Sequence, residues 1–150
     1  MRQALELARL HSADGRHGPF GAVVVRANRM VGRGWNRVVE DTDPTAHAEI
    51  MAIRDASRAL QTFDLGGCHI YSTCQPCPMC LAAIHWARID RIFYAATAAD
   101  AAEHGFDDSR IYRELATPQT ERSIPEHQIL REEALAVFRD WTNNPPRVPY

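Results

Sequence analysis

The sequence contains no lysine, because all 17 of its basic residues are arginine. A chain without lysine cannot form a Schiff base with a carbonyl substrate or with pyridoxal phosphate, and it cannot supply a P-loop lysine. Long apolar runs are also missing. Residues 66–87 carry no Asp, Glu or Arg, but they include Pro, His, Gln and Ser and are too polar to span a membrane. Residues 1–6 lack the apolar core of a signal peptide, so we expect a cytoplasmic protein.

Cysteine is scarce as well, with four residues in a chain of 150. Two of them form Cys77-x-x-Cys80, and such sparse cysteines fit a reducing cytoplasm better than a disulfide framework. The formal net charge is −2, so no basic field indicates a nucleic-acid partner. Hydrophobic residues make up 45% of the chain, which is enough for one domain of ordinary size with its own core.

The hydrophobic pattern predicts an α/β fold. We expect helices over residues 2–11, 45–60 and 76–88, and strands over residues 20–25, 30–36, 68–73 and 90–95. This order predicts a three-layer α/β/α sandwich, in which helices flank a mixed sheet that begins with an antiparallel hairpin. Beyond residue 97 we expect mainly short helices, with a further strand over residues 126–130 that brings the sheet to about five strands.

His47, Cys77 and Cys80 are the predicted ligands of a zinc ion. Cys77 and Cys80 are three residues apart and therefore lie on one face of a helix, near its first turn. No fourth Cys or His follows at a comparable spacing, so one position of a tetrahedral zinc is left for water. A structural zinc site is normally closed by four protein ligands, whereas a catalytic site keeps one position open. The pattern therefore indicates a hydrolytic enzyme.

Glu49 follows His47 by two residues and is the candidate general acid and base. A water molecule on zinc has its pKa lowered to about 7, so hydroxide becomes available at neutral pH. A carboxylate beside that water can take its proton and deliver it to the substrate and then to the leaving group. A protein that only binds zinc for stability has no need of such a carboxylate.

His47-Ala48-Glu49 followed by Pro76-Cys77-x-x-Cys80 resembles the signature of the zinc-dependent nucleobase deaminases. The segments Gly18–Ala22, Trp86–Arg88 and Gly105–Tyr112 further resemble the guanine deaminases of the cytidine-deaminase superfamily. This resemblance implies a cytidine-deaminase-like fold, one zinc ion per subunit, and hydrolysis of guanine to xanthine and ammonia in purine catabolism or salvage. It also implies a homodimer, whose C-terminal segments are exchanged in some family members.

The resemblance also implies site residues, carried over position by position. Asn36 and Asp108 would contact the purine, and Tyr150 would lie against the base. Glu133 would help to move protons on the amino side, as a second catalytic carboxylate. The substrate-binding set is Asn36, Ala48, Asp108, Tyr150, Phe20 and Trp86, although Trp86 is equally well explained as a core residue. We expect a single domain over residues 1–150, in which residues 98–150 form a helical extension and pocket lid. Gln75 departs from the glutamate that is usual in the family.

Two other interpretations compete with a guanine deaminase. A tRNA adenosine deaminase fits the segment Thr45–Ala52 equally well, but it would need a basic surface for the RNA backbone. Other nucleobase or nucleoside deaminases, acting on cytosine, guanosine or triazines, share the same zinc signature. The non-enzymatic alternative is a zinc-stabilised scaffold that binds a nucleotide or a partner without turnover, and Glu49 argues against it.

Overall fold

The computed structural model describes residues 1–149, so the prediction for Tyr150 lies outside the described residues. The chain divides into two compact units, Met1–Ser109 and Arg110–Tyr150. Unit 1 contains four strands and four helices: α1 (Arg2–Ser12), β1 (Gly21–Arg26), β2 (Arg29–Trp35), α2 (Ala48–Leu60), β3 (Cys68–Cys74), α3 (Pro78–Trp86), β4 (Arg91–Ala96) and α4 (Ala98–Glu103). These elements match the order expected from the hydrophobic pattern.

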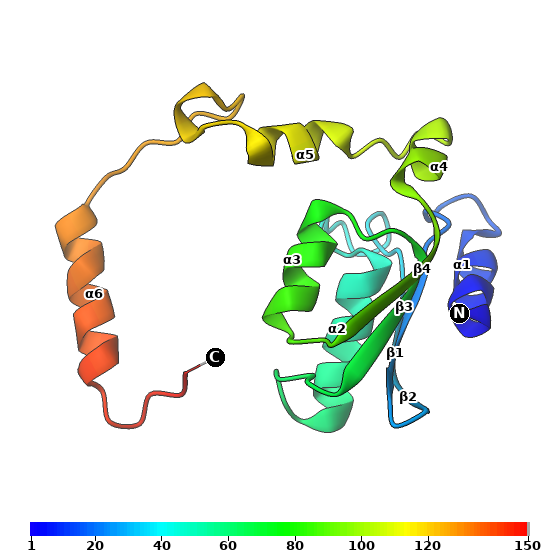
Figure 1. The fold of residues 1–150 in the computed structure, drawn as a ribbon, viewed down its shortest axis with the longest axis horizontal. Coiled ribbons are helices and arrows are strands. Elements are labelled where there is room, and N and C mark those ends of the chain that lie inside the picture. The colour runs from blue at the N-terminus through cyan, green and yellow to red at the C-terminus, as the bar shows by residue number, and fades with distance from the viewer. Residues whose placement is uncertain (150) are drawn as a thin grey trace. The chain divides into compact units, whose positions relative to one another are not determined.

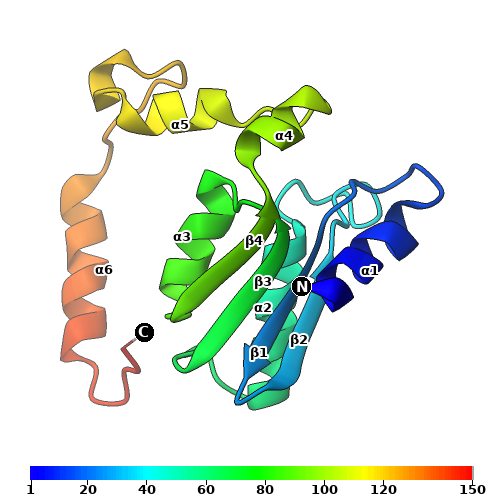
Figure 2. The same ribbon diagram turned by 45° about the vertical axis from the view of Figure 1, so that its right-hand side comes forward.

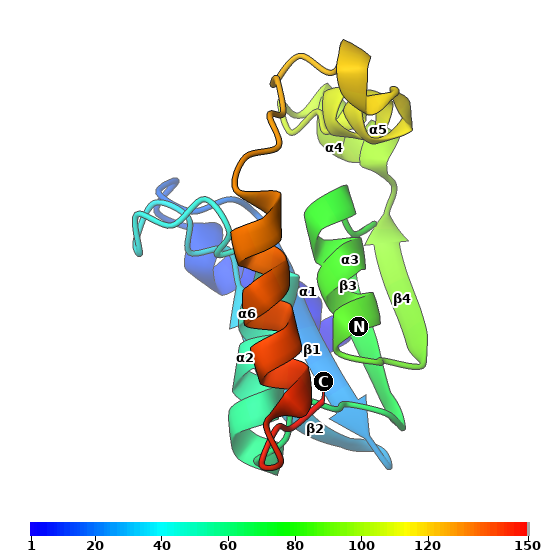
Figure 3. The same cartoon turned by 90° about the vertical axis from the view of Figure 1, so that its left-hand side faces the viewer.

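The strands form one mixed sheet in the order β2-β1-β3-β4 (Figure 2). β1 is antiparallel to both β2 and β3, whereas β3 and β4 are parallel. Ala27 and Asn28 connect β1 to β2 with positive φ angles, as a two-residue hairpin turn requires. α2 and α3 lie side by side on one face of the sheet (Figure 3), and α1 lies on the other (Figure 1). Unit 1 is therefore the predicted three-layer α/β/α sandwich.

The glycines of β2 allow α2 to pack directly against the strand backbone. A Cβ atom at Gly32 would collide with the backbone of Ala52 and Ala56, and one at Gly34 would collide with the backbone of Ala48 and Ala52. Only hydrogen at these positions leaves room for the helix. The positions of Gly32 and Gly34 therefore determine how close the first turn of α2 lies to the sheet.

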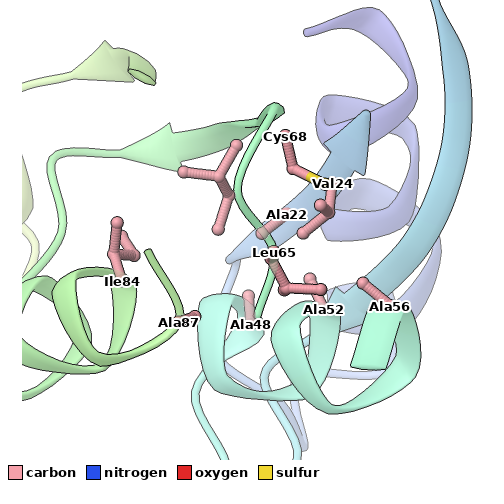
Figure 4. Close-up of a cluster of buried hydrophobic side chains, with 10 residues drawn as sticks. Ala22, Val24, Ala48, Ala52, Ala56, Leu65, Cys68, Ile84 and Ala87 are labelled. Atoms are coloured by element: carbon pink, nitrogen blue, oxygen red, sulfur yellow. The ribbon is translucent and has the colours of Figure 1, made fainter. Parts of the chain in front are cut away.

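The core between the sheet and α2–α3 is built largely from small side chains (Figure 4). Alanines of α2 face the strands, and α3 contributes Ile84 to the same cluster. The buried cluster consists of Ala22, Val24, Ala48, Ala52, Ala56, Leu65, Cys68, Ile70, Ile84 and Ala87. Short side chains keep the layers close, because the interior of a protein packs at nearly crystalline density.

Unit 2 is helical over its described residues 110–149. It contains most of α5 (Ser109–Ala116), a short 3-10 turn (Gln119–Glu121) and α6 (Arg131–Asn143). The prediction of a further strand over residues 126–130 is wrong, because these residues form no strand and are all exposed. The sheet has four strands, not about five, since extended backbone joins a sheet only where a strand edge is available to pair with it. No helix within residues 1–149 combines the length and apolarity needed to cross a membrane.

Replacing Gly34 by alanine should destabilise unit 1, because the added Cβ would push α2 away from β2. We expect a loss of about 1–3 kcal/mol in the free energy of unfolding, which is typical of overpacking. The measurement is urea unfolding of both proteins. Gly66→Ala is the matched control, since its Cβ would meet only a side-chain oxygen of Asp64. Equal stability of the two variants would contradict the close packing of α2.

Candidate active site

Several predicted site residues of unit 1 lie at one end of the sheet. β2, β3 and β4 run in the same direction, so their carboxyl ends lie at this end, where β1 begins. Phe20 immediately precedes β1 and Asn36 immediately follows β2. The helices α2 and α3 both begin after strands that end here. Ligands in α/β folds characteristically bind at the carboxyl ends of strands.

A predicted metal ligand immediately precedes each of the two helices. His47 is the N-cap of α2 and Cys77 is the N-cap of α3, and neither side chain makes a capping hydrogen bond. Thr45, two residues before His47, donates a hydroxyl hydrogen bond to Asp43 and does not cap α2. The partial positive charge at the start of each helix therefore lies beside His47 and Cys77, where it favours thiolate.

The structure brings His47, Cys77 and Cys80 together at distances that suit zinc. Their ligand atoms all lie within 4.8 Å of one another. His47 Nδ1 is 3.5 Å from the sulfur of Cys77 and 3.5 Å from the sulfur of Cys80. In a tetrahedral site with Zn–S bonds of about 2.3 Å and Zn–N bonds of about 2.0 Å, nitrogen and sulfur are roughly 3.5 Å apart. The three side chains therefore fit a zinc ion without rearrangement.

The two thiols differ in their readiness to bind a metal. A hydrogen bond from the Cys80 thiol, with help from His47, lowers the pKa of Cys77 to about 4. The same hydrogen bond and burial raise the pKa of Cys80 above its ordinary value. Because zinc binds cysteine as thiolate, Cys77 is already in the ligand form at neutral pH, whereas Cys80 must release its proton when the metal binds.

Glu49 lies beside the metal ligands and is only 6% exposed. Its Oε2 atom is 3.5 Å from the sulfur of Cys80. Burial raises the pKa of Glu49, because an ionised carboxylate loses its hydration there. A carboxyl group with a raised pKa accepts and releases a proton more readily near neutral pH, which suits a general acid and base.

Ser72 on β3 is a site residue that the motifs did not reveal. Its hydroxyl donates a hydrogen bond of 2.8 Å to Oε1 of Glu49, and the side chain is 1% exposed. The available signal was its position within β3, since Ser72 is a polar residue on the strand face that also carries Ile70. A buried hydroxyl requires a hydrogen-bond partner, and the sequence alone does not name it.

Asn36 is held next to the start of α2 by the loop that connects them. The backbone N–H of Arg37 donates to the carbonyl of Ala46 at 2.9 Å, and the N–H of Asn36 donates to the carbonyl of Phe20 at 3.1 Å. The side-chain oxygen of Asn36 accepts a hydrogen bond from the N–H of Val38. With its oxygen occupied in this way, the Asn36 amide presents its NH₂ group as a donor.

Asp108 lies close to Cys77, and Phe20 lies just before the start of β1. Burial raises the pKa of Asp108, and the charge of Cys77 raises it further, as expected for two acidic groups that are close together. Phe20 is partly buried against the core and contacts Phe106 edge to face, with ring centroids 4.8 Å apart. The segment after β4 therefore brings Phe106 against Phe20 and brings Asp108 close to Cys77.

The other predicted residues have different placements. Ala48 is fully buried in the first turn of α2. Trp86 lies at the opposite end of α3 from Cys77 and is 68% exposed, so unit 1 does not bring it to the metal ligands. Glu133 is exposed in the first turn of α6, in unit 2. The side-chain oxygen of Gln75 accepts a hydrogen bond from the N–H of Ala98, which connects the end of β3 to the start of α4.

Residues 1–96 match a family model described as the cytidine and deoxycytidylate deaminase zinc-binding region. Guanine deaminase from Bacillus subtilis (strain 168) is 48% identical over 143 residues, covering 95% of this chain and 92% of that protein. The X-ray structure of guanine deaminase from Bacillus subtilis matches with a TM-score of 0.95 and 46% identity, covering 99% of this chain and 95% of that chain. A tRNA-specific adenosine deaminase from Buchnera aphidicola is 34% identical over 144 residues, covering 96% of this chain and 92% of that protein.

The geometry predicts which side chains retain zinc. Replacing Cys77 by serine should reduce bound zinc to background, because a thiolate ligand is lost. Glu49→Gln should keep its zinc, since Glu49 is adjacent to the ligands but is not one of them. Elemental analysis of the purified variants measures the difference. Cys68→Ala serves as the control, because Cys68 is a buried core cysteine outside the site. Zinc loss in Glu49→Gln, or zinc retention in Cys77→Ser, would contradict the assignment.

Proposed function

This chain belongs to the cytidine and deoxycytidylate deaminase family, and on that premise we propose that it hydrolyses guanine to xanthine and ammonia. The observation that carries the proposal is the similarity to Bacillus subtilis guanine deaminase, at 48% identity, along 95% of the chain. The family model ends at residue 96, so this similarity extends well beyond the zinc-binding region. The reaction belongs to purine catabolism or salvage.

We assign His47, Cys77 and Cys80 to one zinc ion per subunit, and Glu49 to proton transfer. The ion supplies a hydroxide nucleophile at neutral pH when it is bound. Glu49 accepts a proton from the attacking water and delivers it to the purine ring. It then takes the proton of the newly added hydroxyl group and passes it to the departing amino group, which leaves as ammonia. Its burial beside Cys80 supports this role, because a carboxyl group that must accept and then release a proton needs a pKa near the working pH.

We assign recognition of the purine to Asn36 and Asp108, against a pocket wall formed by the Ala48 backbone and Phe20. Guanine carries N1–H and an exocyclic amine as donors, which an ionised Asp108 can accept. Its N7 and O6 atoms are acceptors, and the NH₂ group of Asn36 can donate to them because its oxygen is already bonded to Val38. Such pairing discriminates strongly, since a buried polar edge left unpaired is costly. We leave Trp86 out of the proposed pocket, because it lies at the opposite end of α3 from Cys77.

We propose that the protein works as a homodimer in which the C-terminal segments are exchanged and close the partner's pocket. No described residue of unit 2 is buried, although α5 and α6 carry several large apolar side chains. The exposed apolar residues include Ile111, Leu115, Val137, Phe138 and Trp141. Short helices that bury so little apolar surface are not stable alone in water, so this segment needs another surface. In this arrangement Glu133 and Tyr150 reach the purine bound by the partner.

The thiol chemistry supports a reducing compartment, and we propose a cytoplasmic location. All four cysteines are free, and two of them must remain thiolates to bind zinc.

A tRNA substrate is the second candidate, because a tRNA-specific adenosine deaminase is 34% identical. The net charge of −2 argues against it, since RNA binding depends on basic side chains that neutralise phosphates. Glu49 argues against a zinc-bound scaffold without activity.

A screen of ammonia release should show guanine as the preferred substrate. The panel contains guanine, adenine, cytosine, guanosine, cytidine, a triazine and a tRNA anticodon stem-loop, the last assayed at low and moderate salt. Glu49→Gln should lower the rate on guanine by about 10²–10⁴-fold, which is the usual contribution of a positioned acid and base. Faster release from the stem-loop than from guanine would favour the tRNA interpretation. Release from no substrate would favour the scaffold.

Exchange of the C-terminal segment can be tested by mixing two defective chains. A chain lacking residues 148–150 should keep its zinc and lose most turnover on guanine, because the pocket of each subunit then stays open. Its mixed dimer with Glu49→Gln should regain one working site of the two. In that site an intact Glu49 combines with the C-terminus of the partner chain.

Differently tagged chains allow the mixed dimer to be purified and assayed beside both parent dimers. A mixed dimer as inactive as its parents would contradict exchange. Full activity of the shortened chain by itself would contradict the lid.

A further inference from the structure

Ser72 lies behind the site, on the sheet face that packs against α2 and α3. It pairs with Ala22 on β1 and with Tyr94 on β4, in the interior of the sheet. Ala22 and Ile70 on the same face belong to the apolar core, and Ser72 itself is 1% exposed. A hydroxyl in such surroundings is costly unless it is hydrogen-bonded. A polar side chain at this position therefore needs a specific partner, and that partner is Glu49.

The hydrogen bond between these side chains has a definite direction. Its length of 2.8 Å is ordinary for a hydroxyl and a carboxylate. An ionised carboxylate can only accept, so the Ser72 hydroxyl donates to Oε1 of Glu49. The other oxygen, Oε2, lies 3.5 Å from the sulfur of Cys80. The two oxygens are thus distinguished, because Oε1 faces the sheet and Oε2 faces the predicted metal ligands.

We infer that Ser72 is a positioning residue for Glu49, an inference that rests on the proposed deaminase function. The hydroxyl holds Oε1 against β3, so that proton transfer takes place on Oε2. At 2.8 Å, the bond from Ser72 is shorter than the 3.5 Å contact between Oε2 and the sulfur of Cys80, and it keeps the carboxyl group in one orientation. A catalytic group that is misplaced by even about 1 Å loses much of its rate advantage.

The decisive comparison is between Ser72→Thr and Ser72→Val. Threonine and valine have nearly the same shape, so any crowding in the buried site affects both variants alike. Only threonine keeps the hydroxyl. We expect Ser72→Val to lower kcat for guanine by about 10–100-fold, the usual effect of removing a residue that orients an active-site group. The KM should change little, because Ser72 contacts Glu49 from the sheet side. Ser72→Thr should retain most of the wild-type kcat, and both variants should retain zinc.

Thr73 provides a control on the same strand. It is buried, and its hydroxyl oxygen accepts a hydrogen bond of 3.1 Å from the N–H of Gly21. Thr73→Val removes a buried hydroxyl that plays no part in orienting Glu49. We expect a lower thermal unfolding temperature but an unchanged kcat. An equal fall in kcat in Thr73→Val and Ser72→Val would overturn the inference, because it would show a general effect of disturbing β3.

Crystal structures of the zinc-loaded wild type, Ser72→Val and Ser72→Thr provide a readout that does not depend on guanine. The Glu49 carboxyl group should be rotated or disordered with valine and should keep its wild-type orientation with threonine. If the wild type releases no ammonia from guanine, the proposed function fails, and this structural comparison still decides the role of Ser72. An unchanged carboxyl group in Ser72→Val, or a kcat for Ser72→Thr as low as that of Ser72→Val, would overturn the inference.

Discussion

One constraint underlies the architecture of unit 1, which is that three predicted metal ligands at the starts of α2 and α3 must converge on one point. His47 Nδ1 lies 3.5 Å from the sulfurs of both Cys77 and Cys80, a separation that the bond lengths of zinc span. Both ligand-bearing helix starts lie at the same edge of the sheet, so their partial positive ends converge where thiolate must form. The direction of the strands, and thus the topology of the sheet, determines which edge of the molecule carries the chemistry.

A second constraint is the short distance between α2 and the strands. Gly32 and Gly34 allow the helix backbone to approach β2, and alanines fill the space that remains. Because α2 lies this close, a residue in its first turn can form a hydrogen bond with a residue of the sheet. Glu49 does so with Ser72, and the carboxyl group that we propose as the acid and base is therefore held by a residue of the sheet. The same packing that stabilises the fold also orients the proposed acid and base.

Unit 2 depends on different physics. Its described residues bury none of their apolar side chains, although the amphipathic pattern of α5 and α6 is pronounced. Residues 126–130 illustrate the same point, because a strand was expected there and none forms. A strand needs a neighbour with which to share its hydrogen bonds, and a helix needs a surface for its apolar face. The local sequence does not identify the surface against which these helices pack, which can belong to the same chain or to a second copy.

The sequence by itself determined the order of helices and strands in unit 1, and it predicted the three candidate metal ligands that the fold brings together. These features are local, because the hydrophobic periodicity and the spacing of Cys77 and Cys80 can be read from short stretches of the sequence. Only the tertiary structure decided the contacts between distant segments, such as the hydrogen bond between Ser72 and Glu49, and it left Trp86 away from the ligands. Those outcomes follow from strand order and from the distance between layers. Strand order and the distance between layers depend on how side chains from distant segments pack together. A short sequence pattern does not contain that information.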